Sequence, residues 1–182
     1  MSRIIILNGV GSVGKSSIAR ALQDITTLPF LHVAMDSFLE MLPAAYFDHP
    51  DGFIFETTLQ EGAPAVVIKT GPVATQLMRG MRRAMAALAA EGNNLIIDDV
   101  MLESDAEEYR TQFAGHDVSY VGVFAPLAVI EQRERARKDR MIGLARWQYE
   151  RVHQGLIYDL VLDTSLLTPA QCAAMIKEIF GL

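Results

Sequence analysis

The sequence predicts an α/β fold with three layers, in which helices cover both faces of a five-stranded parallel sheet. Short apolar runs alternate along the chain with segments of helical periodicity, as they do where crossover helices join parallel strands. The first apolar run, Arg3–Asn8, leads directly into a glycine-rich segment and then into a helix start. No linker or repeat interrupts the chain, so residues 1–182 are expected to form a single domain.

The five expected strands are short apolar runs, as is typical of strands that are buried on both faces of a parallel sheet. Their expected ranges are residues 3–8, 30–36, 94–100, 118–124 and 158–163. Three of the expected helices lie between them, over residues 15 to about 26, 104–113 and 127 to about 138. The stretch over residues 37–72 contains four prolines and three glycines, and we interpret it as an irregular insertion over the core.

Two further helices have clear end signals. The first is expected over residues 72–91, where apolar residues recur at helical spacing and Gly92 stands at the position of a C-terminal cap. Its methionines are therefore expected in the core. The last helix is expected over residues 168–180, because Thr168 and Gln171 form a capping-box pattern around Pro169.

The composition excludes several classes of protein. The net charge of −6 disfavours nucleic acid as a general partner. The longest apolar stretch, residues 121–130, is far below the roughly 18 residues of a spanning helix, so no membrane partner is expected and a cytoplasmic location is predicted. Cys172 is the only cysteine, which excludes an intrachain disulfide and a cysteine metal cluster. The sequence leaves homo-oligomer formation open.

Residues 9–16 match G-x-x-x-x-G-K-[ST], the pattern of the phosphate-binding loop, or P-loop. Glycines let backbone N–H groups converge on phosphate oxygens, and a helix N-terminus adds partial positive charge. Lys15 is expected to reach the β- and γ-phosphates of ATP, and Ser16 to offer its hydroxyl to Mg²⁺. The predicted nucleotide-binding residues are Gly9, Val10, Gly11, Ser12, Val13, Gly14, Lys15, Ser16 and Ser17.

Three aspartates follow predicted strands at one edge of the sheet. Asp98 and Asp99 end the third strand, where a carboxylate can hold Mg²⁺ directly or through water. Asp98 is preferred and Asp99 is the second candidate, while solvated turn acids are the alternative interpretation. Asp36 ends the second strand, where it is placed to accept the proton of an acceptor hydroxyl. An equally weighted alternative is that Asp36 caps a helix starting at Ser37.

Five arginines lie within fourteen positions: Arg133, Arg135, Arg137, Arg140 and Arg146. One interpretation is a solvated helix with i,i+4 pairs such as Glu131 with Arg135. The other is a lid over residues 133 to about 150, whose guanidinium groups close over the phosphates and stabilise the charge of phosphoryl transfer. We favour the lid, with at least one arginine contacting phosphate.

The chain contains, in order from about residue 3 to residue 165, the segments IILNGVGSVGKSS, MDSFLEMLP, LIIDDV, RERARKDR and VHQGLIYDLVLDTS. Together they resemble the chloramphenicol phosphotransferase family of small P-loop kinases. The resemblance implies a P-loop kinase-like fold with an arginine-bearing lid. It also implies transfer of the γ-phosphoryl group of ATP to a primary hydroxyl of chloramphenicol, which inactivates the antibiotic, with Asp36 as base. Arg133, Arg137 and Arg140 match the family's pattern, and Arg135 is additional.

The acceptor is the part of this hypothesis that the sequence defines least, because the resemblance is poorest over residues 44–70. Residues that could form an apolar acceptor pocket are Phe38, Leu39, Met41, Phe53 and Phe55. Two alternatives stay open: a kinase of nucleotide sugars resembling the zeta toxins, and an ATP-dependent switch that acts on a protein partner. An anionic nucleotide sugar needs positive charge in its pocket, and residues 36–70 contain only Lys69, which favours a neutral acceptor.

Overall fold

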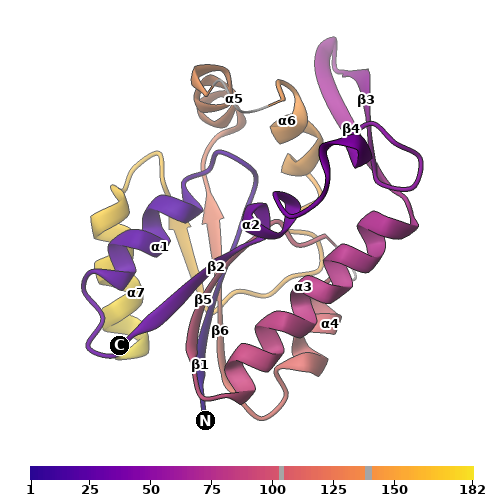
Figure 1. Ribbon diagram of the computed structural model, residues 1–182. Coiled ribbons are helices and arrows are strands. Elements are labelled where there is room, and N and C mark those ends of the chain that lie inside the picture. Colours follow the sequence, from indigo (N-terminus) through magenta and orange to yellow (C-terminus); the bar gives the residue numbers. More distant parts are fainter. Residues whose placement is uncertain (103–104, 138–140) are drawn as a thin grey trace.

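The computed structural model describes residues 1–102, 105–137 and 141–182. Its centre is a parallel sheet of five strands in the order β2-β5-β1-β6-β7 (Figure 1). These strands are β1 (Arg3–Asn8), β2 (Phe30–Ala34), β5 (Asn94–Asp99), β6 (Asp117–Phe124) and β7 (Leu160–Asp163). The structure confirms the predicted five-stranded parallel sheet.

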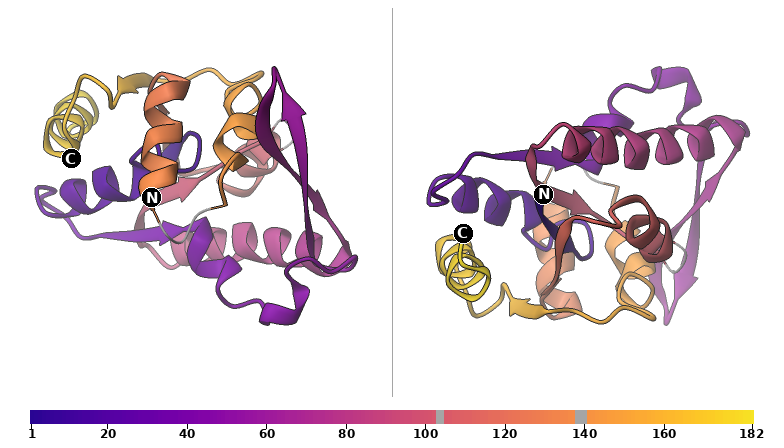
Figure 2. Two further views of the ribbon diagram at one scale, coloured as in Figure 1. Left: turned by 90° about the horizontal axis from the view of Figure 1, so that it is seen from above. Right: turned by 90° about the horizontal axis from the view of Figure 1, so that it is seen from below.

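Helices cover both faces of this sheet, which confirms the predicted three layers (Figures 1 and 2). Helices α1 (Lys15–Gln23) and α7 (Pro169–Phe180) lie on one face, and α3 (Pro72–Ala90) and α4 (Asp105–Gln112) lie on the other. The side chains of β1 alternate between the two cores. Ile5 and Leu7 belong to the α1/α7 core, and Ile4 and Ile6 to the α3/α4 core. Because both faces of β1 are buried, its sequence is continuously apolar.

The residues that were predicted to begin or end the long helices α3 and α7 do so in the structure. Met81 and Met85 of α3 are fully buried, and Gly92 has a positive φ of 91° just after the helix. Thr168 and Gln171 form the expected capping box at the start of α7. Helix α1 is shorter than predicted, because it ends at Gln23. Predicted helix ends at Ser104 and Lys138 lie outside the described residues.

Residues 37–72 are more regular than predicted. They contain a 3₁₀ helix, η1 (Ala44–Tyr46), and an antiparallel hairpin of β3 (Phe53–Gln60) and β4 (Ala63–Thr70). Glu61 and Gly62 connect the two strands with positive φ angles of 52° and 77°, as a two-residue hairpin turn requires. The tip of the hairpin is exposed, so its side chains do not alternate regularly between buried and exposed positions. That is why periodicity did not reveal it.

Two more helices, α5 (Leu127–Ala136) and α6 (Leu144–Tyr149), lie beyond the edge of the sheet, and α6 lies beside the hairpin (Figure 1). The N–H of Val66 in β4 donates a 2.9 Å hydrogen bond to the carbonyl of Gly143. Gly143 has a φ of 97°, and a Cβ there would lie 2.8 Å from the carbonyl oxygen of Pro64, so this contact requires glycine. In the part of the chain that the structure describes, we find no helix with the length and apolar character to cross a membrane.

Candidate active site

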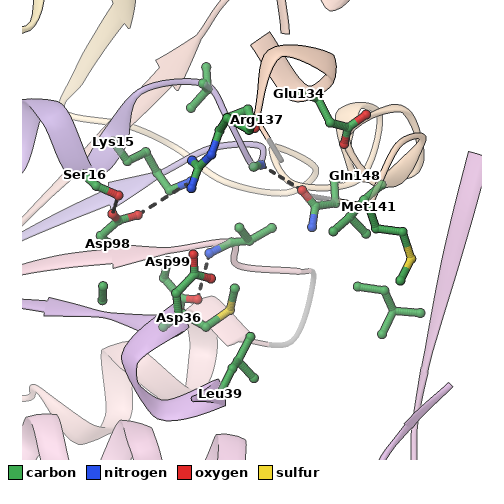
Figure 3. A pocket seen from close by; sticks show the side chains of 18 of the residues that line it. Lys15, Ser16, Asp36, Leu39, Asp98, Asp99, Glu134, Arg137, Met141 and Gln148 are labelled. Carbon is green, nitrogen blue, oxygen red and sulfur yellow. Dashed lines mark hydrogen bonds and ion pairs between the residues drawn. The ribbon is translucent and has the colours of Figure 1, made fainter. Parts of the chain in front are cut away.

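A cavity of about 1080 Å³ opens where β1, β2 and β5 end. Its walls come from the loop after β1, from α2 (Met35–Leu39), from the end of β5, from the hairpin and from α5 and α6. Parallel sheets bind ligands at the carboxyl ends of their strands, so this is the edge where a site is expected. Figure 3 shows the side chains that face this cavity.

The P-loop has the backbone conformation that its glycines permit. Ser12 and Gly14 have positive φ angles of 64° and 110°, which turns successive N–H groups towards one concave surface. A Cβ on Gly9 would lie 2.4 Å from the carbonyl oxygen of Val123 in β6, so only glycine fits there. Of the predicted nucleotide-binding residues, Gly9 and Val10 do not line the cavity. The side chain of Val10 is buried in the core instead. The others, which do line the cavity, are Gly11, Ser12, Val13, Gly14, Lys15, Ser16 and Ser17.

Lys15 is buried at the start of α1. Its Nζ donates hydrogen bonds to the carbonyls of Gly9 at 2.8 Å and Val10 at 3.1 Å. The same nitrogen lies 3.7 Å from Oδ1 of Asp98. The ammonium group is thus held between the loop and the acidic end of β5, where a phosphate chain on the loop would meet it.

Asp98 and Ser16 form the pair that suits a magnesium ion. The hydroxyl of Ser16 donates a 2.6 Å hydrogen bond to Oδ2 of Asp98, and Nε2 of His32 lies 3.6 Å from the same oxygen. Burial raises the pKa of Asp98, but the contacts with His32, Lys15 and Ser16 outweigh it and hold the pKa below its usual value. The carboxylate therefore stays charged. One hydroxyl and one carboxylate fit Mg²⁺, which keeps several waters and uses few protein ligands.

The structure separates Asp99 from that pair. Asp99 accepts hydrogen bonds from the hydroxyl of Tyr109 at 2.6 Å and from the N–H of Val100 at 2.7 Å. Burial raises its pKa, in spite of these hydrogen bonds. Both aspartates are buried, so the alternative of solvated turn acids is wrong. Among the described residues, no group of three or more His, Cys, Asp or Glu side chains could hold a metal by itself.

Asp36 lies on α2 rather than at the end of the second strand, which stops at Ala34. Ala34 occupies the N-cap position of α2 and Asp36 the second helical position, so the prediction that Asp36 caps a helix from Ser37 is wrong. The pairing of Ala34 with Asp98 brings the start of α2 beside the end of β5. Asp36 lines the cavity together with Lys15 and Asp98 (Figure 3).

The arginines of the predicted lid have different surroundings. Arg133 of α5 donates to the carbonyl of Val13 at 3.2 Å and to the hydroxyl of Thr164 at 2.9 Å, and it also lines the cavity. It therefore fastens α5 to the P-loop. Arg137, just after α5, lines the cavity as well, and in Figure 3 its side chain extends towards Lys15. Arg140 lies outside the described residues.

The two other arginines of the cluster meet at Glu131. Arg135 is exposed and lies 4.0 Å from Glu131, which is the predicted i,i+4 pair. Arg146 of α6 lies 2.5 Å from the same glutamate. The first pair lies within α5, and the second joins α6 to α5, so the solvated-helix interpretation holds for part of the cluster only.

Two side chains of the site gave no signal in the sequence. Glu134 lies within the charged run, yet it is buried and accepts hydrogen bonds from the N–H groups of Gly143 and Ala145, both at 2.8 Å. It caps the start of α6 from α5. Gln148 of α6 is buried, and its Oε1 accepts a 2.8 Å hydrogen bond from the N–H of Gly11 in the P-loop. Periodicity and motif searches cannot find such contacts, because each contact joins residues that belong to different segments of the chain.

The wall opposite the P-loop is apolar and aromatic. The rings of Phe47, Phe53 and Phe55 stack with centroids 6.1 to 6.5 Å apart, and all three line the cavity. Leu39, Ile68 and Met141 extend this wall. Of the residues that the sequence suggested for an apolar pocket, Leu39, Phe53 and Phe55 line the cavity, whereas Phe38 packs on the α3/α4 core and Met41 is exposed.

A basic residue that the sequence analysis did not consider also reaches this cavity. Arg82 of α3 is buried and lines it. Its Nε lies 2.6 Å from Glu108, and its Nη1 lies 3.3 Å from Asp105. Two carboxylates thus balance the charge of Arg82.

Comparisons with known proteins found a relative named as an O-phosphotransferase and kinases of similar fold. A protein of Mycobacterium tuberculosis strain H37Rv named "Putative O-phosphotransferase Rv2636" is 29% identical over 185 residues, which cover 98% of this chain and 82% of that protein. Among solved structures, a sugar kinase from Janibacter sp. HTCC2649 is similar in fold with a TM-score of 0.70 and 20% identity, covering 100% of this chain and 95% of the other.

Two further structures extend the likeness in fold to kinases with other acceptors. The APS kinase CysC of Mycobacterium tuberculosis, in complex with AMPPNP and APS, has a TM-score of 0.66 at 15% identity over 100% of this chain and 98% of its own. The shikimate kinase of Aquifex aeolicus has a TM-score of 0.56 at 16% identity, covering 98% and 96%. The model of the family described as chloramphenicol phosphotransferase-like protein matches residues 2–181. The chain is thus a kinase-type enzyme with a P-loop kinase fold, and it belongs to the chloramphenicol phosphotransferase-like protein family.

Proposed function

We propose that the protein transfers the γ-phosphoryl group of ATP to a hydroxyl group of a small molecule. The observation that carries this proposal is the placement of Lys15, the Ser16–Asp98 pair and Asp36 around one cavity. Lys15, Ser16 and Asp98 form the side of the cavity that binds phosphate and magnesium, and Asp36 is a carboxylate on the neighbouring wall. Phosphoryl transfer needs positioning and charge stabilisation more than covalent chemistry, and this set of groups supplies both.

In the proposed reaction, the acceptor hydroxyl faces Asp36 and attacks the γ-phosphorus. A bond forms between the acceptor oxygen and phosphorus, and the bond from phosphorus to the β–γ bridging oxygen breaks, leaving ADP. Asp36 takes the hydroxyl proton, a step typically worth about 10² to 10⁴ in rate. Lys15, Arg137 and Arg140 stabilise the negative charge on the phosphates, while Arg133 keeps the P-loop in place. Ser16 and Asp98 would hold Mg²⁺, which supplies further neutralisation of phosphate charge.

The aromatic wall supports a neutral, partly apolar acceptor, and we propose chloramphenicol as the first candidate. Phe47, Phe53 and Phe55 offer stacked rings to an aromatic group. Arg82, which lines the cavity, is already paired with Glu108 and Asp105, which favours a neutral acceptor over a nucleotide sugar. The family name supports the same choice, and inactivation of an antibiotic would be the biological result. Residues 133 to about 150 would act as the lid of this single domain.

The test is a mass-spectrometric assay of the purified full chain with ATP, Mg²⁺ and chloramphenicol. We expect a product that is heavier by one phosphoryl group. Asp36→Asn should abolish this product and leave ATP affinity nearly unchanged, whereas Lys15→Ala should lower both. Glu178→Gln, which alters an exposed acid of α7, is the matched control and should behave as the wild-type protein.

Other results of this assay would favour a different acceptor or a different function, or would contradict the proposal. ATP binding without a phosphorylated product removes chloramphenicol as acceptor and sends the search to other hydroxylated small molecules. Slow ATP hydrolysis that Asp36→Asn does not alter and no small molecule accelerates would favour a nucleotide-dependent switch with a protein partner. A chain that does not bind ATP contradicts the proposal.

A further inference from the structure

The P-loop holds the side-chain amide of Gln148 in one orientation. Because the N–H of Gly11 is a donor, the oxygen of the amide must face it, and the NH₂ group must face the other way. Figure 3 shows this nitrogen turned to the cavity, on the side of Asp36 and Asp99. Within residues 1–102, 105–137 and 141–182, Nε2 of Gln148 has no hydrogen-bond acceptor. A buried residue thus presents an unused donor to the proposed reaction site.

The backbone that carries Gln148 is fixed from both sides. Glu134 caps the start of α6, and the neighbouring carbonyl of Gly143 is bound to Val66 of the hairpin. After α6, the carbonyl of Val152 accepts a 2.7 Å hydrogen bond from the side chain of Asn8, which is the last residue of β1. The amide nitrogen is therefore placed by contacts to α5, to the hairpin and to the central strand, as a catalytic donor requires.

Gly11 provides a separate observation for the same contact. A Cβ at this position would lie 3.3 Å from Oε1 of Gln148, closer than side chains normally pack. Gly11 has no positive φ and thus no backbone reason to be glycine. The absence of a side chain at Gly11 lets Gln148 approach the loop. The missing side chain of Gly11 in the P-loop thus leaves the space that the side chain of Gln148 in α6 occupies.

We propose that Gln148 is a catalytic residue whose Nε2 donates a hydrogen bond to the γ-phosphoryl group of ATP while Oε1 stays on Gly11. This inference rests on the proposed phosphotransferase function. Lys15 reaches the phosphates from the loop, and Asp36 faces the acceptor, so the transferring group lies between them. Negative charge spreads over its equatorial oxygens during transfer, and a fixed neutral donor there stabilises it.

The substitution Gln148→Glu separates this role from a structural one. A carboxylate keeps an oxygen for the N–H of Gly11, but it replaces the donor with a second, negatively charged oxygen. The affinities of the full chain for ADP and for AMPPNP, both with Mg²⁺, should be measured by calorimetry. We expect ADP to bind within about twofold of wild type and AMPPNP to bind about 10-fold or more weakly, which is the usual effect of losing a hydrogen bond to a charged group.

Two further variants complete the experiment. Gln148→Leu removes both hydrogen bonds and should also weaken AMPPNP more than ADP. Gln154→Leu alters an exposed glutamine in the following loop and should change neither affinity. In the phosphoryl-transfer assay, Gln148→Glu should lower kcat, since the lost contact is made to the transferring group.

The possible results are distinguishable. Wild-type binding of AMPPNP by Gln148→Glu would overturn the role of Gln148, and so would an equal loss of ADP and AMPPNP, which indicates a purely structural contact. Either result would leave the proposed function intact. A wild-type chain that binds neither nucleotide would overturn the proposed function and this inference with it.

Discussion

The hydroxyl of Ser16 donates a 2.6 Å hydrogen bond to Oδ2 of Asp98, although 82 positions separate the two residues. The contact exists because β1 and β5 are neighbours in the sheet, so that the P-loop after β1 meets the acidic end of β5. The hydroxyl and the carboxylate thereby come together next to the ammonium group of Lys15.

Asp98→Asn should raise the Mg²⁺ concentration needed for half-maximal phosphoryl transfer by about 10- to 100-fold, because the pair loses its anionic ligand. The measurement is a magnesium titration of product formation at saturating ATP. Asp99→Asn is the matched control, since Asp99 is bound to Tyr109 instead, and its magnesium requirement should stay that of wild type. An equal shift in both variants would contradict this assignment.

Glu134→Ala should lower the free energy of unfolding by about 1–3 kcal/mol, because two buried N–H groups of α6 lose their acceptor. Urea unfolding monitored by circular dichroism measures the change. Glu150→Ala removes an exposed glutamate at the other end of α6 and should alter stability by less than about 0.5 kcal/mol. If the two variants were equally stable, Glu134 would not be the cap of α6.

His153 should make stability depend on pH. Its ring stacks on Phe124, and burial, with a smaller effect of the charge of Lys15, lowers the pKa of His153 to about 4. Between pH 6.5 and 4 the unfolded chain binds a proton that the folded chain does not, so stability is lost as pH falls through this range. Allowing for the partial exposure of the ring, we expect a loss of up to about 1 kcal/mol between pH 7.5 and 5.5.

Comparison of wild type with His153→Gln isolates this contribution from those of the other histidines. Urea unfolding at pH 7.5, 6.5 and 5.5 should give a shallower dependence on pH for the variant. Parallel curves for the two proteins would show that His153 titrates alike in the folded and the unfolded state.

Phe55→Ala should raise KM for chloramphenicol about 10-fold, if this compound is the acceptor, because one ring of the stacked aromatic wall is lost. The KM for ATP should not change, since Phe55 lies on the wall opposite the P-loop. Steady-state kinetics of product formation measure both constants. Leu59→Ala, at the exposed tip of the hairpin, serves as control. A rise in the KM for ATP alone would place Phe55 on the nucleotide side instead.

The sequence by itself determined the layers of the fold and the nature of the P-loop. Those features depend on local rules: buried parallel strands are continuously apolar, helices show a 3.6-residue period and capping residues, and a phosphate loop needs glycine before lysine. The apolar run before Gly9 and the capping box at Thr168 are examples in which one segment suffices.

Only the tertiary structure decided how the site is arranged. Adjacent side chains of β5 point to opposite faces of the sheet. Asp98 therefore contacts Ser16 of the P-loop, whereas Asp99 contacts Tyr109. The hairpin, the cap at Glu134 and the contact between Gln148 and Gly11 are likewise determined by packing between distant segments. Such contacts leave no periodicity or motif in the sequence, because each is made by single residues whose partners lie elsewhere in the chain.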